Sequence, residues 1–146
     1  MSEIVRRPAG TIAGGRITPP LTDETKGLVG ADELDLLPDG AILINVGRAA
    51  IVDEEAFYNA IVAGKLRAAG SDVWYNYPDS RESRTNTPPS RFPFNELDNM
   101  VMSPHRGAAF GSPYTERMRM LHLAQLFNAA NRGETIPNRV DLARGY

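Results

Sequence analysis

The sequence of 146 residues contains no cysteine, which excludes disulfide bonds and thiol chemistry and is compatible with a reducing cytoplasm. It also has no long apolar run, because stretches such as Ala41–Val46 are far shorter than the roughly 20 residues that span a bilayer. The N-terminal segment lacks the hydrophobic centre of a signal peptide. We therefore expect a soluble, cytoplasmic protein without a membrane partner.

Charge of one sign and metal-binding side chains are scarce as well. The 16 basic and 18 acidic residues are interspersed and give a net charge of −2, so the sequence does not predict a nucleic-acid partner. The two histidines, His105 and His122, are far apart, and no acidic ligand cluster accompanies them, so we expect no metal site. The chain also has no Gly-x-Ser-x-Gly sequence, which argues against a serine hydrolase.

The elements that are present alternate between strand and helix signals. Apolar runs bounded by turn residues predict strands at 41–46, 68–74 and 100–102. The first run is almost unbroken, which is typical of a strand buried on both faces of a parallel sheet. Helix signals predict helices at 31–37, from the N-cap Asp53 to Gly64, and at 114–132. Strand, helix and strand with tight links indicate an α/β fold with a parallel sheet.

Two further segments are less regular. Residues 1–20 are rich in glycine and proline and show no periodicity, so we expect a loosely attached arm. Residues 75–99 form a polar, proline-rich segment, and loops of this length in a compact domain are usually functional or mobile. The long helix at 114–132 carries apolar residues on one flank, among them Met118, Leu121, Leu126 and Ala129.

Arg48 and His105 each follow a predicted strand, where ligands bind in open α/β sheets. The Arg48 guanidinium can bind a carboxylate with two parallel hydrogen bonds, but it can equally pair with Asp53 or Glu54 on the surface. The His105 imidazole can exchange a proton near neutral pH, but a single histidine is often an ordinary structural residue.

Asp72 falls within the predicted strand at 68–74. A carboxylate in an apolar strand is unfavourable unless it is hydrogen-bonded. The residue can therefore be an acceptor for a cofactor amide or a structural contact inside the protein. His122 falls within the long predicted helix and is interpreted as structural.

A series of short motifs connects these residues: LTDETKGLVG at 21–30, GAILINVGR at 40–48, VDEEA at 52–56, DVW at 72–74 and SPH at 103–105. In this order and spacing they resemble the C-terminal part of the D-2-hydroxyacid dehydrogenases, over roughly residues 19–132. That family comprises NAD(P)-dependent oxidoreductases that transfer a hydride between nicotinamide and a 2-hydroxy or 2-keto acid. The resemblance therefore implies NAD or NADP as cofactor and a small 2-hydroxy or 2-keto acid as substrate.

The resemblance also implies an architecture: a partial Rossmann-like parallel sheet with flanking helices and a long C-terminal helix. We expect an irregular N-terminal arm at 1–18 and the C-terminal half of a NAD-binding Rossmann-like domain at 19–110. Residues 111–146 then hold the long helix and tail, which in the family return to the substrate domain.

The resemblance assigns roles to individual residues. Arg48 is expected to hold the substrate carboxylate, and His105 to act as the acid/base. Asp72 is expected to accept a hydrogen bond from the nicotinamide side of the cofactor. Cofactor-lining positions are expected at Pro19, Val46, Gly47, Arg48, Asp72, His105 and Gly107.

One position departs from the family pattern. The family usually has a glutamate five residues after the strand aspartate to hold the catalytic histidine, and formate dehydrogenases have a glutamine there. This chain has Tyr77 at that position, so we include it among the candidate catalytic residues. Its hydroxyl can bind an imidazole by a hydrogen bond, but it does not supply the charge of a carboxylate.

The family chain is about twice as long, and Gly-x-Gly-x-x-Gly does not occur here. We therefore expect a truncated half that lacks full activity alone. The alternatives are an inactive remnant that acts as a dimerisation module, or one chain of a split dehydrogenase. The partner is accordingly expected to be a second copy or a separate N-terminal half. The choice between NAD and NADP, and the identity of the acid, stay open.

Overall fold

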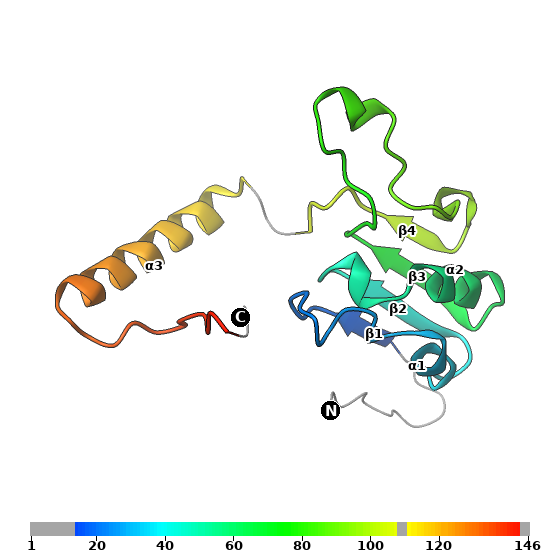
Figure 1. The fold of residues 1–146 in the computed structure, drawn as a ribbon, viewed down its shortest axis with the longest axis horizontal. Helices are drawn as coiled ribbons and strands as arrows, with labels where there is room; N and C mark the ends of the chain where they lie inside the picture. Colours follow the sequence, from blue (N-terminus) through cyan, green and yellow to red (C-terminus); the bar gives the residue numbers. More distant parts are fainter. Residues whose placement is uncertain (1–13, 108–110, 144–146) are drawn as a thin grey trace. The chain divides into compact units, whose positions relative to one another are not determined.

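The computed structural model describes residues 14–107 and 111–143. The chain divides into two compact units, Met1–His105 and Arg106–Tyr146. The first unit contains the sheet, and the second contains a long helix (Figure 1).

The sheet has four parallel strands in the order β1-β2-β3-β4 (Figure 1). Their bounds are β1 Gly14–Ile17, β2 Ala41–Asn45, β3 Leu66–Ser71 and β4 Met100–Met102. This arrangement confirms the predicted α/β class and parallel sheet. The prediction of an irregular arm at residues 1–18 is wrong for residues 14–17. These residues form β1, which pairs with β2 in the register Ile17↔Asn45. The remainder of that prediction, residues 1–13, lies outside the described residues.

Two helices connect the strands: α1 Ala31–Asp35 and α2 Glu54–Val62. The Asp53 carboxylate accepts a hydrogen bond of 2.9 Å from the Ala56 amide, which makes Asp53 the N-cap of α2 as predicted. Gly64 follows the helix with a φ of +75°, a left-handed conformation that favours glycine.

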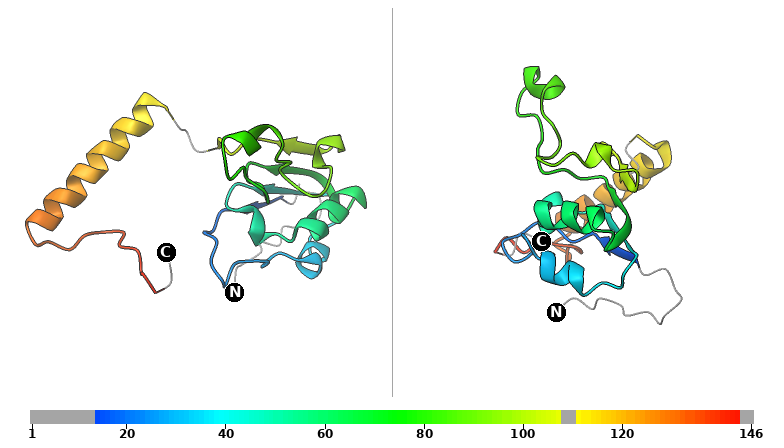
Figure 2. Two further views of the ribbon diagram at one scale, coloured as in Figure 1. Left: turned by 45° about the horizontal axis from the view of Figure 1, so that its top comes forward. Right: turned by 90° about the vertical axis from the view of Figure 1, so that its right-hand side faces the viewer.

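The hydrophobic core lies on one face of the sheet. Leu34 of α1 and Phe57 of α2 belong to the same buried cluster as Leu43 of β2, so both helices cover this face (Figure 2). On the other face Ile44 is 38% exposed. The prediction that residues 41–46 are buried on both faces is therefore wrong, because in the first unit's described part the helices cover one face only.

The segment 75–99 is partly folded onto α2. It contains two short 3₁₀ helices, Glu82–Thr85 and Phe94–Glu96. The ring of Phe94 lies 5.5 Å from that of Phe57, and the ring of Phe92 stacks on Tyr58 at 5.0 Å. These contacts attach the C-terminal part of the segment to the core.

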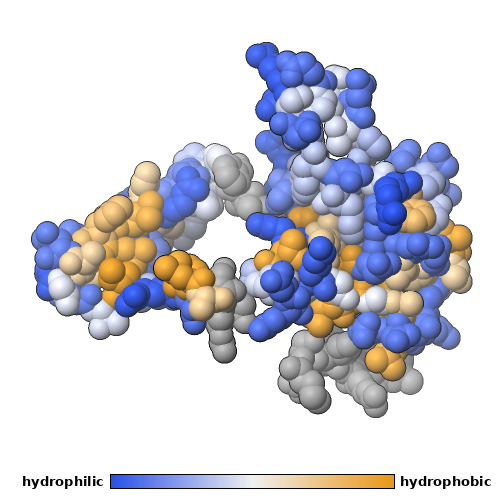
Figure 3. Space-filling model, in the orientation of Figure 1, coloured by the Kyte–Doolittle hydropathy of each residue, from blue (hydrophilic) through white to orange (hydrophobic). Residues whose placement is uncertain are grey.

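The second unit contains α3, Pro113–Asn131, which begins with proline and is followed by Gly133 at a φ of +65°. Most apolar side chains of α3 are exposed, and on the face seen in Figure 3 they form a patch beside hydrophilic residues. The exposed ones are Tyr114, Met118, Met120, Leu121, Leu123 and Phe127. In the described part of the chain, no helix combines the length and the apolar character needed to cross a membrane.

Candidate active site

The candidate residues of the first unit gather where the strands end. Because β2, β3 and β4 are parallel, their carboxyl ends lie at one edge of the sheet. Asn45 is the last residue of β2 and the Val46–Arg48 turn follows it, Asp72 follows β3, and Ser103–His105 follows β4. The prediction that Asp72 lies within a strand is wrong, since β3 ends at Ser71. The residue therefore lies at the sheet edge, and it is 7% exposed.

The turn after β2 is held by a side chain that sequence reasoning did not select. Asn45 is 1% exposed, its amide donates to the Arg48 carbonyl at 3.1 Å, and its Oδ1 accepts from the Gly47 amide at 3.1 Å. One amide side chain thus satisfies both ends of the turn. A polar residue inside an otherwise apolar run was the sequence signal that could have identified it.

Gly47 is confined by the chain after β1. A Cβ atom at this position would lie 3.0 Å from the Pro19 carbonyl oxygen and 3.2 Å from that of Ile17. Both neighbours are backbone atoms, which give way less easily than flexible side chains, so this position favours glycine. The contact also brings Pro19 beside Gly47, and both were predicted as cofactor-lining positions.

Arg48 is exposed, and its guanidinium donates to the Gly47 carbonyl at 2.8 Å. The two carboxylates considered as its partners are used elsewhere. Asp53 caps α2, and Glu54 binds Arg91 at 2.7 Å. The Arg48 guanidinium is therefore folded onto its own backbone at the surface of the sheet edge, where an incoming anion can reach it.

The structure joins His105 to Tyr77. The Tyr77 hydroxyl lies 3.0 Å from His105 Nδ1, at hydrogen-bonding distance, and it accepts a bond of 3.0 Å from the Trp74 amide. The Trp74 indole donates to the Ser103 carbonyl at 2.8 Å, which ties the two strand ends together. His105 has a φ of +57°, a conformation that costs a non-glycine residue roughly 1 kcal/mol or more.

The other predicted positions are less informative. Val46 is 46% exposed, and its amide donates to the Ile17 carbonyl at 3.1 Å. Gly107 is exposed and belongs to the second unit. His122 lies within α3, as predicted, and is exposed. Over residues 14–107 and 111–143, no group of three acidic, histidine or cysteine side chains could hold a metal ion.

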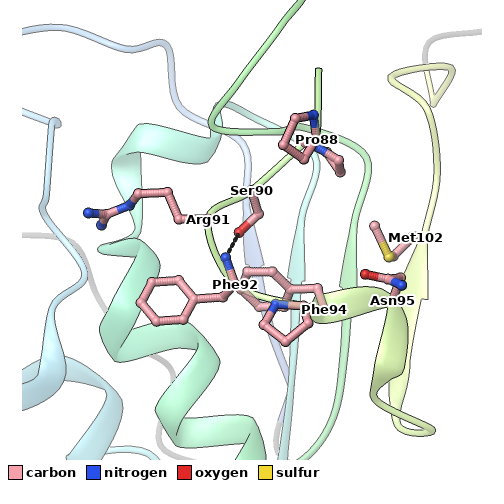
Figure 4. A pocket seen from close by; sticks show the side chains of 9 residues that line it. Pro88, Ser90, Arg91, Phe92, Phe94, Asn95 and Met102 are labelled. Atoms are coloured by element: carbon pink, nitrogen blue, oxygen red, sulfur yellow. Dashed lines mark hydrogen bonds between the residues drawn. The ribbon is translucent and has the colours of Figure 1, made fainter. Parts of the chain in front are cut away.

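A hollow of about 350 Å³ lies beside the proline-rich segment (Figure 4). It is lined by residues 88–95 and Met102. None of the predicted site residues belongs to this lining, although Met102 is the last residue of β4.

Known proteins give an independent comparison. Residues 16–107 match the family described as D-isomer specific 2-hydroxyacid dehydrogenase, NAD binding domain. The chain is 43% identical over 93 residues to glyoxylate/hydroxypyruvate reductase B of Pectobacterium atrosepticum, covering 64% of this chain and 26% of that protein. It is 41% identical over 90 residues to D-3-phosphoglycerate dehydrogenase of Archaeoglobus fulgidus, covering 62% of this chain and 15% of that protein. The chain thus spans about a quarter or less of these two relatives.

Solved structures agree with the sequence matches. A D-isomer specific 2-hydroxyacid dehydrogenase of Xanthobacter autotrophicus Py2, in complex with NADPH and MES, has a TM-score of 0.73 and 32% identity over 91% of this chain and 50% of that one. A probable 2-hydroxyacid dehydrogenase of Rhizobium etli, in complex with NADP, HEPES and L(+)-tartaric acid, has a TM-score of 0.68 and 29% identity. That match covers 91% of this chain and 39% of the other.

Proposed function

Because the chain belongs to the D-isomer specific 2-hydroxyacid dehydrogenases, through their NAD binding domain, we propose that it takes part in hydride transfer between a nicotinamide cofactor and a 2-hydroxy or 2-keto acid. The observation that carries this proposal is the pairing of His105 with Tyr77 at the sheet edge that also presents Arg48. An imidazole held by a hydroxyl, and a guanidinium within the same row of strand ends, suit an acid that carries both a carboxylate and a reactive oxygen.

The residues after β2 fit the nicotinamide end of a dinucleotide. Gly47 lies beside Pro19, and the neighbouring Val46, which is 46% exposed, offers an apolar surface for a flat ring. Asp72 provides an acceptor at the neighbouring strand end. The bound cofactor, NAD or NADP, supplies or accepts the hydride, and the protein supplies orientation and a proton.

His105 exchanges the proton. With Nδ1 bound to the Tyr77 hydroxyl, the ring orientation is fixed, and Nε2 is the nitrogen that serves the substrate oxygen. Tyr77 takes the place of the family's glutamate in this arrangement and positions the ring without adding a negative charge. Arg48 binds the substrate carboxylate by exchanging its bond to the Gly47 carbonyl for a bidentate pair.

Full turnover by this chain requires more polypeptide, because Gly-x-Gly-x-x-Gly does not occur in its sequence. We assign the missing dinucleotide loop to a separate N-terminal half, since a second copy would lack it as well, and the location to the cytoplasm. A second candidate function is a non-catalytic dimerisation module. The exposed apolar side chains of α3 favour it, since large apolar surfaces often mark interaction sites.

A binding experiment on the chain itself tests the proposal. NADH and NADPH are titrated by fluorescence and calorimetry, and glyoxylate is then added to the complex. We expect Arg48→Ala to weaken glyoxylate binding at least tenfold, since a charged hydrogen-bonded pair is worth about 1.5–3 kcal/mol. Arg67→Ala is the matched control, because Arg67 is an exposed arginine of β3 outside the site. If both variants bind glyoxylate equally, the dehydrogenase proposal fails and the interaction module is favoured. A folded chain that binds neither nucleotide contradicts a half-site that works alone and leaves the split dehydrogenase or the interaction module.

A further inference from the structure

Glu54, the first residue of α2, is a buried carboxylate outside the predicted site. Glu54 is 8% exposed, and both of its carboxylate oxygens accept hydrogen bonds from the proline-rich segment 75–99. One oxygen accepts from the Ser90 hydroxyl at 2.8 Å and from the Arg91 amide at 2.9 Å, and the other accepts from the Arg91 guanidinium at 2.7 Å. A carboxylate this well satisfied fixes the backbone at residues 90–91 to the start of α2.

The fixed backbone in turn holds the residues before Tyr77. The Pro89 carbonyl accepts hydrogen bonds of 3.1 Å from both the Tyr75 and the Asn76 amides. The Asn76 side chain donates to the Pro88 carbonyl at 3.2 Å. Two stretches of the segment that are more than ten residues apart are thus joined next to Tyr77.

Other anchors of this region act on different atoms. The Tyr75 hydroxyl donates to the Val52 carbonyl at 3.0 Å, which holds its side chain rather than the following backbone. Figure 4 shows the Arg91 side chain pointing away from Met102, and the Ser90 hydroxyl accepts a hydrogen bond from the Phe92 amide at 2.9 Å. Glu54 is therefore the residue on α2 that connects to Pro89 through its immediate neighbour, Ser90.

We infer that Glu54 is a positioning residue for the candidate acid/base: by holding Ser90 and Arg91 it places Pro89 against Tyr75 and Asn76, and so keeps the Tyr77 hydroxyl on His105 Nδ1. This inference rests on the proposed function for the meaning of the Tyr77–His105 pair. The placement itself is a property of the chain without substrate or cofactor. It can therefore be measured independently of activity.

The test follows the imidazole ¹⁵N resonances of His105 by NMR at one fixed pH. Tyr77→Phe serves as the reference, because it removes the hydroxyl bound to Nδ1. We expect Glu54→Ala to move the Nδ1 resonance in the same direction as Tyr77→Phe. The double variant is expected to move it no further than Tyr77→Phe alone, since both changes act through one contact. Glu54→Gln keeps an oxygen that accepts from Ser90 and the Arg91 amide, so its resonance is expected to remain near the wild-type position.

Two controls separate positioning from loss of stability. Glu55→Ala removes a neighbouring exposed carboxylate of the same helix turn, and Ile61→Val lowers stability from within the core of α2. Both are expected to leave the Nδ1 resonance unchanged, although Ile61→Val lowers the melting temperature. A wild-type resonance in Glu54→Ala, or an equal shift in Ile61→Val, overturns the inference. If Tyr77→Phe leaves the Nδ1 resonance unchanged, Tyr77 does not bind His105 in solution. The pair then has no part in the proposed function, and the role assigned to Glu54 is overturned.

Discussion

The turn after β2 and the segment that carries Tyr77 reach the same sheet edge by different means. Asn45 organises its turn through partners two and three residues away, Gly47 and Arg48. Tyr77 depends on Glu54, whose partners Ser90 and Arg91 lie 36 and 37 residues along the chain. The first arrangement is set by local sequence, whereas the second exists only once the segment has packed on α2. Substitutions within the turn should therefore cause large losses of stability. Substitutions that affect the segment should cause smaller losses.

The largest effect is expected for Gly47→Ala. The added methyl group would meet the Pro19 and Ile17 carbonyl oxygens at 3.0 and 3.2 Å, and neither atom can yield without moving β1. We expect a loss of about 3 kcal/mol in the free energy of unfolding, measured in urea. Gly70→Ala is the control, because its Cβ would meet its nearest neighbours at an ordinary 3.9 Å. Equal stability of the two variants would contradict the steric argument.

Asn45→Ala should rank second. The substitution leaves the buried Gly47 amide and the partly buried Arg48 carbonyl without their side-chain partner. The expected loss is about 2 kcal/mol by urea unfolding, with weaker binding of anions at Arg48 as a secondary effect. If Asn45→Ala were as stable as the wild type, the turn would not depend on local hydrogen bonds and the comparison would fail.

A third, smaller effect concerns the pH dependence of the segment's anchor. Burial raises the pKa of the Glu54 carboxyl, but hydrogen bonds from Arg91 and Ser90 outweigh it and hold the pKa below its ordinary value of 4.5. The stabilisation is thus fully present above pH 4.5 and is lost as the pH falls through the lower folded-state pKa.

Wild type should therefore exceed Glu54→Gln by about 1 kcal/mol near neutral pH, with the difference vanishing in acid. Urea unfolding across this pH range measures it, with Glu55→Gln as the control. A difference that grows toward low pH would contradict the assigned sign.

The smallest effect on stability is expected for Tyr77→Phe. Tyr77 is 51% exposed, and water can replace its hydroxyl at the Trp74 amide. We expect a change within about 0.5 kcal/mol in the free energy of unfolding. A loss as large as that of Asn45→Ala would show that Tyr77 belongs to the structural framework rather than to the site.

The same contrast explains what the sequence predicted. Strand β2, helix α2 and its Asp53 cap carry signals within a few residues, and the structure has them at the predicted places. Strand β1 was missed because a short segment that begins Gly14-Gly15 has neither alternation nor β-branched residues before Ile17, and only pairing with β2 makes it a strand. The ends of β3 and the burial of β2 were predicted wrongly. Both depend on the neighbouring strands and helices that pack against the sheet, which the local sequence does not specify.

The site followed the same rule. Arg48 and His105 were identified by their positions after strands and by a resemblance spread over short motifs, and their catalytic roles stay predictions. Asn45 had a weak local signal. Glu54 had none that pointed to Arg91, because a charged residue in the first turn of a helix is already explained by the helix dipole.

The phenol beside His105 makes the site's response to ionic strength distinctive. A carboxylate at that position would form an exposed ion pair with imidazolium, which dissolved salt screens over roughly 8–10 Å at physiological concentrations. The Tyr77 hydroxyl carries no charge, and the Glu54 carboxylate that holds its segment is buried. The geometry at His105 should therefore change little at high salt, whereas anion binding at the exposed guanidinium of Arg48 should weaken.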